Sequence, residues 1–427
     1  MSVPVPRTIR SAAPVLAFIF VAVLVIQVYR SPDYKLIPGY PMLTPFYFEP
    51  PEASVLHSVI RGDNVAWTMD NETAWHSVGR HPNQPECWTF EDRFGAYKNL
   101  SLEMAAAISN NNKKNRSKKA IILRLGGGND ANGKSAWKSQ FIWHVRSLVM
   151  EAGYLAGYDV LIFVHLDLNE EDRNAWLQRL PKELQPLVQT FSTRQLKEWI
   201  RGGQFKNVYE HNHIPIQMFM EKNPQYDFVY SIENDVRLIG RWDTFLADVD
   251  TEYSFHRKYQ KSDQNMSSIP DLVSFQSISQ PPSDWVWYKE KEDQKCVKHF
   301  GGKDNILFSL GAVWGWSRQL TDSLTKLNTE GFNCYFEYFA PTVARWANLT
   351  SFFYQHPLYC PNRDSPSERH TINPDKLGKN DPRLVQSSKV PVGCTYYFIN
   401  IHSQPFWDTW YQNPRACRPP ALVHPVK

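Results

Sequence analysis

From residue 119 onward, short apolar runs alternate with segments of helical periodicity. Residues 120–124, 159–165 and 228–232 are nearly continuous apolar runs, which is typical of strands that are covered on both faces. Between these runs, apolar residues recur every three or four positions, as expected for helices with one buried stripe. The predicted helices are residues 135–152, 192–200 and 214–221. The alternation predicts an α/β fold, with a mixed, mostly parallel sheet flanked by helices.

The N-terminal region shows a different pattern. Residues 12–29 are almost uninterrupted Ala, Val, Leu, Ile and Phe, about the length that crosses a bilayer as a helix. A cleaved signal peptide is the alternative, but the run ends at Arg30 without the small residues of a cleavage site. Arg7 and Arg10 precede the run, so we expect residues 1–11 to be a cytosolic tail. The pattern predicts a type II signal anchor, with the remaining chain in the lumen of the Golgi apparatus or endoplasmic reticulum.

Two further segments follow the predicted anchor. Residues 30–118 are rich in proline, asparagine and small polar residues and lack sustained periodicity, which favours extended backbone. They predict a lumenal stem, and Trp75 and Trp88 suggest that its second half packs partly onto the domain. Residues 119–427 are expected to form the catalytic domain.

Composition and modification signals agree with a lumenal domain. A hydrophobic content of 42% is ample for a packed core, and a net charge of +4 with one dense basic run, residues 113–119, gives little support to a nucleic-acid partner. The cysteines lack zinc-binding spacing, so we expect disulfides among Cys87, Cys296, Cys334, Cys360, Cys394 and Cys417, with the pairing open. N-glycosylation sequons, expected of a glycoprotein, occur at Asn71, Asn99, Asn115, Asn265 and Asn348.

An acid-x-acid motif, Glu233-x-Asp235, follows the third apolar run directly. Parallel sheets bind ligands at the carboxyl ends of their strands, so these carboxylates are expected where chemistry occurs. The placement resembles the GT-A fold of nucleotide-sugar glycosyltransferases, in which a short acidic motif here holds a divalent cation. The resemblance implies that Asp235 is a ligand of Mn²⁺ or Mg²⁺, and that Glu233 is a second ligand or a contact to the nucleotide ribose. Arg237 is a candidate contact to the bound nucleotide. The alternative is an ordinary turn in which Asp235 pairs with Arg237.

Glu337 is the candidate catalytic residue. A small-residue strand at 310–318 precedes it, and Glu337 opens the helix that follows. This order resembles the GT-A fold of nucleotide-sugar glycosyltransferases, in whose inverting members such an acid is the general base for the acceptor hydroxyl. If the reaction retains stereochemistry, Glu337 would only position the acceptor. The structural alternative is a carboxylate favoured by the positive end of the helix dipole.

The same resemblance suggests further binding residues. Arg124, Gly126 and Gly127, at the end of the first strand, lie where the GT-A fold places the nucleotide. Several GT-A families complete the metal site with a C-terminal histidine after a short apolar strand. His402 fits that place and His424 is a competing candidate, while a structural role is the alternative for both.

Four segments together resemble a family common in filamentous fungi, catalogued as domain of unknown function number 3405. The resemblance extends from about residue 119 to the C-terminus and is carried by residues 232–240, 337–344, 355–359 and 424–427. Ile232 and Leu238 stand where the family usually has aromatic residues. The resemblance implies a GT-A-like enzyme without supplying its substrate.

The sequence thus predicts a metal-dependent glycosyltransferase that moves a sugar from a nucleotide-sugar donor to a glycan, glycoprotein or glycolipid. Two alternatives stay open. The domain could be a non-catalytic module that binds glycans or partner proteins in the lumen. It could also be a glycoside hydrolase in which Glu233 and Glu337 act as a carboxylate pair.

Overall fold

The structure is a computed structural model of the chain. It describes residues 66–69, 73–78, 88–98, 117–126, 139–200, 205–259, 268–281, 294–354, 356, 358–360, 395–396 and 403–427. These residues belong to one compact unit, Pro51–Lys427. The predicted tail, anchor and most of the stem lie outside the described residues. Within the described part of the chain, no helix is both long and apolar enough to cross a bilayer.

The described unit is built on a seven-stranded sheet with the order β11-β9-β10-β7-β4-β5-β6. Six strands run in one direction, and β10 alone is antiparallel to both of its neighbours. The strands are β4 (Lys119–Gly126), β5 (Asp159–His165), β6 (Val188–Phe191), β7 (Phe228–Glu233), β9 (Leu272–Ser274), β10 (Val313–Ser317) and β11 (Ser351–Phe353). The predicted mixed, mostly parallel sheet is confirmed.

Both faces of this sheet are covered, which explains the continuous apolar runs. In β4, Ala120 and Ile122 point into one buried cluster, whereas Ile121 and Leu123 point into the other. Since neighbouring residues of a strand face opposite sides, every position of such a strand must be apolar.

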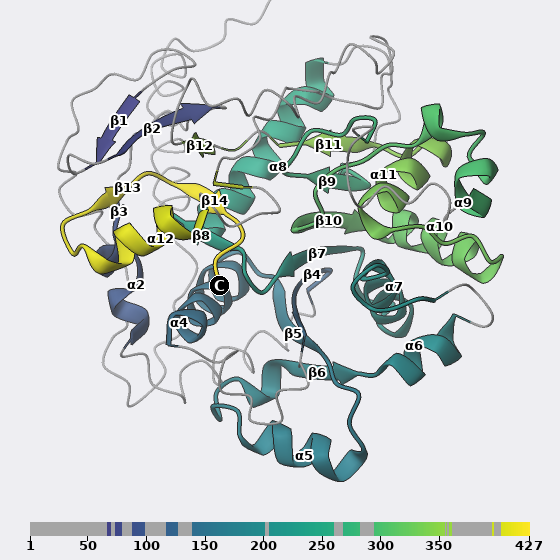
Figure 1. The fold of residues 1–427 in the computed structure, drawn as a ribbon, viewed down its shortest axis with the longest axis horizontal. Helices are drawn as coiled ribbons and strands as arrows, with labels where there is room; N and C mark the ends of the chain where they lie inside the picture. Colours follow the sequence, from purple (N-terminus) through teal and green to yellow (C-terminus); the bar gives the residue numbers. More distant parts are fainter. Residues whose placement is uncertain are drawn as a thin grey trace, which may run out of the picture. The chain divides into compact units, whose positions relative to one another are not determined.

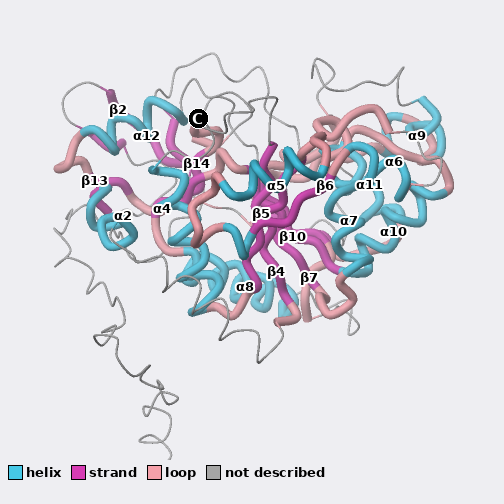
Figure 2. The backbone as a smooth tube through the Cα atoms, turned by 90° about the horizontal axis from the view of Figure 1, so that it is seen from below, coloured by secondary structure: helices cyan, strands magenta, loops and turns pink. Residues whose placement is uncertain are grey.

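Helices supply the two covering layers (Figures 1 and 2). One layer consists of α4 (Ser139–Leu148), the π-helical η3 (Val149–Leu155) and α8 (Trp242–Tyr259). The other consists of α6 (Thr193–Trp199), α7 (His213–Lys222), α10 (Arg318–Thr329) and α11 (Phe336–Trp346). The remaining helices near these layers are α5 (Glu170–Gln178), η4 (Gln185–Leu187), α9 (Gln294–His299) and η5 (Lys303–Asn305).

Residues from the predicted stem pack onto the domain. β3 (Trp88–Thr89) pairs with β13 (Cys417–Arg418), and α2 (Phe90–Lys98) contacts α4. From α2, the buried Arg93 forms two hydrogen bonds of 2.8 and 2.9 Å with Glu151, which also accepts from the N–H of Trp242 at 2.8 Å. The predicted contact between stem and domain is therefore present.

Small additional sheets pair segments of the unit that lie far apart in the sequence. β1 (Ala66–Met69) and β2 (Thr73–Val78) form a hairpin that is extended by β12 (Leu358–Cys360), and β8 (Arg237–Ile239) pairs with β14 (Ala421–Val423). The C-terminal region also contains α12 (Ser403–Gln412). As predicted, cysteines are paired: Cys296 and Cys334 form a disulfide, and Cys417 is disulfide-bonded as well.

Candidate functional site

The candidate site lies where the strand order reverses. The chain proceeds from β4 to β5 and β6 on one side and then returns to place β7 on the other side of β4. Ligands bind in sheets of this kind at such a switch point, beyond the carboxyl ends of the strands. Arg124 near the end of β4 pairs in register with Glu233 at the end of β7. Glu233 therefore stands at the edge where a ligand is expected.

Three residues from this edge and from the C-terminus come together. The Nε2 atom of His424 lies 3.1 Å from Oε2 of Glu233 and 3.4 Å from Oδ1 of Asp235. The antiparallel pairing of β14 with β8 brings His424 there, and the N–H of Val426 donates to the carbonyl of Asp235 at 2.8 Å. Of the two competing histidines, His424 thus joins the acidic motif, whereas His402 lies outside the described residues.

The donor set of this cluster fits a divalent cation. Glu233, Asp235 and His424 each offer one ligand atom, and these atoms all lie within 4.8 Å of one another. Carboxylate oxygens suit both Mn²⁺ and Mg²⁺, and an imidazole nitrogen is the commonest protein ligand of metal ions in general. Burial lowers the pKa of His424, but hydrogen bonds with Asp235 and Glu233 outweigh it and raise this pKa to about 10. The two carboxylates therefore stabilise a positive charge at this place, including the charge of a protonated His424.

Arg124 connects this cluster to the loop before β10. Its guanidinium donates to Oε1 of Glu233 at 3.2 Å and to the carbonyl of Gly311 at 2.7 Å. Gly311 must be glycine because a Cβ atom there would overlap the ring of Phe336. Burial lowers the pKa of Arg124, and the nearby carboxylates of Glu233, Asp235 and Glu337 counteract it.

Glu337 lies in the first turn of α11, as predicted, and faces the same loop. Its Oε1 atom accepts from the N–H of Gly311 at 3.0 Å, and its carbonyl accepts from the N–H of Ser309 at 3.0 Å. Burial raises the pKa of Glu337 to about 8, although the Gly311 N–H lowers it. A carboxyl group that titrates near neutral pH can accept a proton effectively, so its electrostatics suit a general base.

Two tyrosines near Glu337 were not expected from the sequence. Tyr209 is 60% exposed, and it is hydrogen-bonded to the buried Tyr335 at the N-cap of α11. Partial burial raises the pKa of Tyr209, and the charges of Glu337 and Glu233 raise it further. An exposed aromatic ring beside the carboxylates is a surface on which a sugar or base can stack. No local signal marks Tyr209, because it lies in a polar stretch before α7.

The other predicted binding residues are placed differently. Arg237 is buried and donates to the carbonyls of Asn234 (2.6 Å) and Val236 (2.8 Å), so its guanidinium supports the turn that carries the acidic motif. Gly126 is exposed at the end of β4, opposite His165 of β5. Gly127 lies outside the described residues.

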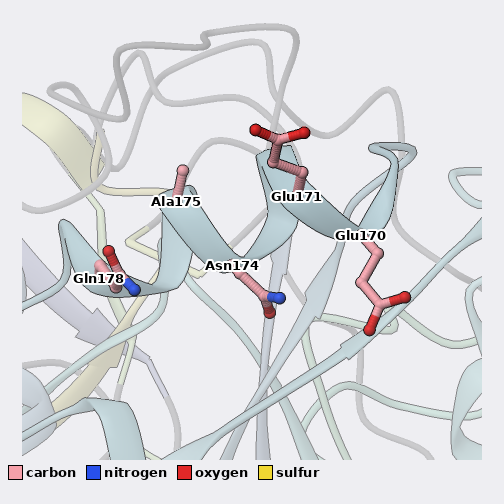
Figure 3. Close-up of a pocket in the computed structure, with 5 residues that line it drawn as sticks. All are labelled: Glu170, Glu171, Asn174, Ala175 and Gln178. Carbon is pink, nitrogen blue, oxygen red and sulfur yellow. The ribbon is translucent and has the colours of Figure 1, made fainter.

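A separate hollow of about 560 Å³ lies along α5 (Figure 3). None of the clustered residues lines it. Its lining consists of the surface residues Glu170, Glu171, Asn174, Ala175 and Gln178. Two exposed carboxylates without a buried polar group beside them do not make a binding site, so the cluster at the switch point is the candidate site.

Fold and site together define an α/β protein with a mostly parallel sheet and an acidic–histidine cluster at its switch point. The family described as "Protein of unknown function (DUF3405)" matches residues 51–262, which confirms the resemblance noted from the sequence. The match begins within the predicted stem, includes Arg124, Glu233 and Asp235, and ends before Glu337. No curated protein matches the chain.

Some solved structures are similar at low identity. The galactosyltransferase LgtC, in complex with donor and acceptor sugar analogues, is 13% identical, with 54% of this chain and 70% of that chain covered and a TM-score of 0.28. The mannosyltransferase Ktr4p from S. cerevisiae is 11% identical, with coverages of 62% and 83% and a TM-score of 0.30. A cytidylyltransferase from Leptospira borgpetersenii serovar Hardjo-bovis is 11% identical, with coverages of 60% and 82% and a TM-score of 0.28. Similarity at this level identifies neither reaction nor substrate.

Proposed function

We propose that the chain is a metal-dependent glycosyltransferase, which transfers a sugar from a nucleotide-sugar donor to a glycan, glycoprotein or glycolipid. One observation carries the proposal: Glu233, Asp235 and His424 converge within 4.8 Å at the switch point of the sheet. A divalent cation held by these residues would offset the negative charge that a nucleoside diphosphate gains as it leaves. Arg124 adds a fixed positive charge beside the same carboxylates.

Glu337 supplies the remaining chemistry in this proposal. Its carboxylate takes the proton of the acceptor hydroxyl while the acceptor oxygen bonds to the anomeric carbon of the donor sugar. The bond from that carbon to the diphosphate oxygen breaks, and the diphosphate leaves with the electron pair. The N–H of Gly311 holds Oε1 of Glu337 in place at 3.0 Å. If the reaction retains stereochemistry, Glu337 instead positions the acceptor.

The raised pKa of Glu337 also fits the hydrolase alternative. A glycosidase needs one protonated and one ionised carboxyl group, and the charge of Glu233 contributes to the high pKa of Glu337. The glycosyltransferase is preferred because the hydrolase pair, Glu233 and Glu337, leaves Asp235 and His424 without a role, whereas both complete a cation-binding cluster with Glu233.

A donor screen separates the candidates. The purified chain is incubated with UDP-sugars and GDP-sugars in the presence of Mn²⁺, Mg²⁺ or EDTA, and release of nucleoside diphosphate is measured. Release that requires a metal and stops with EDTA supports the transferase. Sugar release from glycans without any nucleotide would favour the hydrolase, and binding to glycans without turnover would favour the non-catalytic module.

The proposed location is a Golgi or endoplasmic-reticulum membrane, with residues 12–29 as the anchor and the domain in the lumen. The disulfide between Cys296 and Cys334 supports this location, because disulfides persist in oxidising compartments.

A further inference from the structure

Helix α11 ends in a turn that contains a sequon, Asn348-Leu349-Thr350. The N–H of Asn348 donates to the carbonyl of Arg345 at 3.1 Å, and the N–H of Leu349 donates to that of Ala344 at 2.8 Å. These two bonds define a Schellman motif, with Asn348 in the left-handed conformation at φ 57°. Leu349 is buried whereas Asn348 is exposed. The motif therefore presents the sequon asparagine at the surface of a rigid turn.

The preceding helix ends in the same motif with a different residue. In α10, the N–H of Gly331 donates to Asn328 at 3.0 Å and that of Phe332 to Leu327 at 2.9 Å, with φ 84° at Gly331. Glycine adopts this conformation without steric cost, and asparagine is less favourable there. Glycine could therefore occupy position 348 as well, and the backbone geometry of the turn after α11 does not by itself require asparagine.

An exposed tryptophan lies two residues before Asn348. Trp346 is 52% exposed, and it is the only tryptophan in the exposed class among the residues with described side chains. Its ring packs against His299 (5.4 Å between centroids) and Phe300 (6.0 Å), and His299 packs against Phe332 at 3.9 Å. These contacts fix the indole on one side and leave much of its surface in water. Covering that surface would remove apolar area from water, which favours the folded chain.

We propose that Asn348 carries an N-linked glycan and that the first sugar of this glycan packs against Trp346. The inference rests on the lumenal location proposed above. The amide nitrogen of Asn348 bonds to the anomeric carbon of a lipid-diphosphate-linked oligosaccharide, and that carbon's bond to the phosphate oxygen breaks. The lipid diphosphate leaves with the electron pair, and the amide loses one proton. The apolar C–H face of the attached sugar then covers the exposed indole.

Occupancy is tested on the full chain produced in a eukaryotic secretory host. Glycosidase treatment in heavy-oxygen water converts each occupied asparagine to a labelled aspartate, which mass spectrometry locates in the peptides. We expect the label at Asn348 and at one or more of Asn71, Asn99, Asn115 and Asn265. Label at those sites but not at Asn348 would overturn this inference and leave the location intact. Absence of label at every sequon would overturn the proposed location together with it.

The contact with Trp346 is tested by hydroxyl-radical footprinting. Asn348→Asp removes the sequon with a side chain of the same size, and Asn348→Gly removes it with the residue that the equivalent turn of α10 already uses. Oxidation of Trp346 should rise in both variants, while oxidation of Tyr411, 40% exposed on α12, should stay constant. A Trp346 that reacts equally in the glycosylated parent and in both variants would contradict the contact.

Discussion

Arg124 and Glu233 face each other in register across β4 and β7, joined by an ion pair of 3.2 Å. Glu233 uses Oε1 for this pair and Oε2 for His424 at 3.1 Å. Because Arg124 also donates to the carbonyl of Gly311, whose N–H binds Glu337, a continuous polar network runs from the acidic motif to the candidate base. A substitution at Arg124 should therefore affect both the acidic motif and Glu337.

The pH dependence of turnover should report the charge state of Glu337. A general base must be ionised, so the rate should rise as the pH increases through about 8, the pKa of Glu337. Arg124 lowers that pKa, so Arg124→Gln should move the rising limb to higher pH. Glu337→Gln should remove the limb and reduce turnover by about 10²–10⁴-fold. An unchanged profile in both variants would show that another group is the base.

The two C-terminal histidines can be separated by substitution. His424→Ala removes one of the three clustered ligand atoms. Loss of a residue that only orients a metal ligand typically lowers metal affinity by about 10–100-fold, so Mn²⁺ affinity should fall by at least this factor. His402→Ala is the matched control and should leave the affinity within error of the parent. Calorimetric titration of Mn²⁺ into each variant gives the comparison. The opposite ranking would identify His402 as the metal ligand and make His424 a structural residue.

The sequence predicts local features of this molecule well. β4, β5 and β7 are predictable because a strand buried on both faces is apolar at every position. The place of Asp235 at the carboxyl edge of the sheet is predictable because the acidic motif follows such a strand. The α6 start was also predictable, since Ser192 and Gln195 form a capping box.

Features that depend on contacts between distant segments could not be predicted from the local sequence pattern. The role of His424 depends on the pairing of β14 with β8, strands that lie far apart in sequence. The antiparallel direction of β10 and the position of Tyr209 beside Glu337 likewise depend on how distant segments pack. The guanidinium of Arg237, expected to contact a nucleotide, instead donates to its own turn because the residue is buried there.

The buried pair of Arg93 and Glu151 should dominate the stability of the contact between α2 and the domain. Glu151→Ala leaves Arg93 as a buried charge without its partner, which typically costs about 3–5 kcal/mol of folding free energy. Urea denaturation measures this loss. Glu198→Ala is the control, because it removes the exposed pair with Arg194 on α6 and should change stability by less than about 0.5 kcal/mol. Equal effects of the two substitutions would show that α2 is not anchored through Glu151.

Metal-dependent nucleotide binding by Asp235→Asn tests the central claim most directly. The amide keeps the size of the carboxylate but removes the charge that a divalent cation requires. The fold should survive because the N–H of Val426 donates to the backbone carbonyl of Asp235, which the substitution keeps. Calorimetry with UDP and GDP, with and without Mn²⁺, measures the binding. We predict that the parent binds one of these nucleotides only with Mn²⁺, and that Asp235→Asn loses this binding at an unchanged melting temperature. Parent-like, Mn²⁺-dependent binding by the variant would contradict the assignment and reduce the acidic motif to a structural turn.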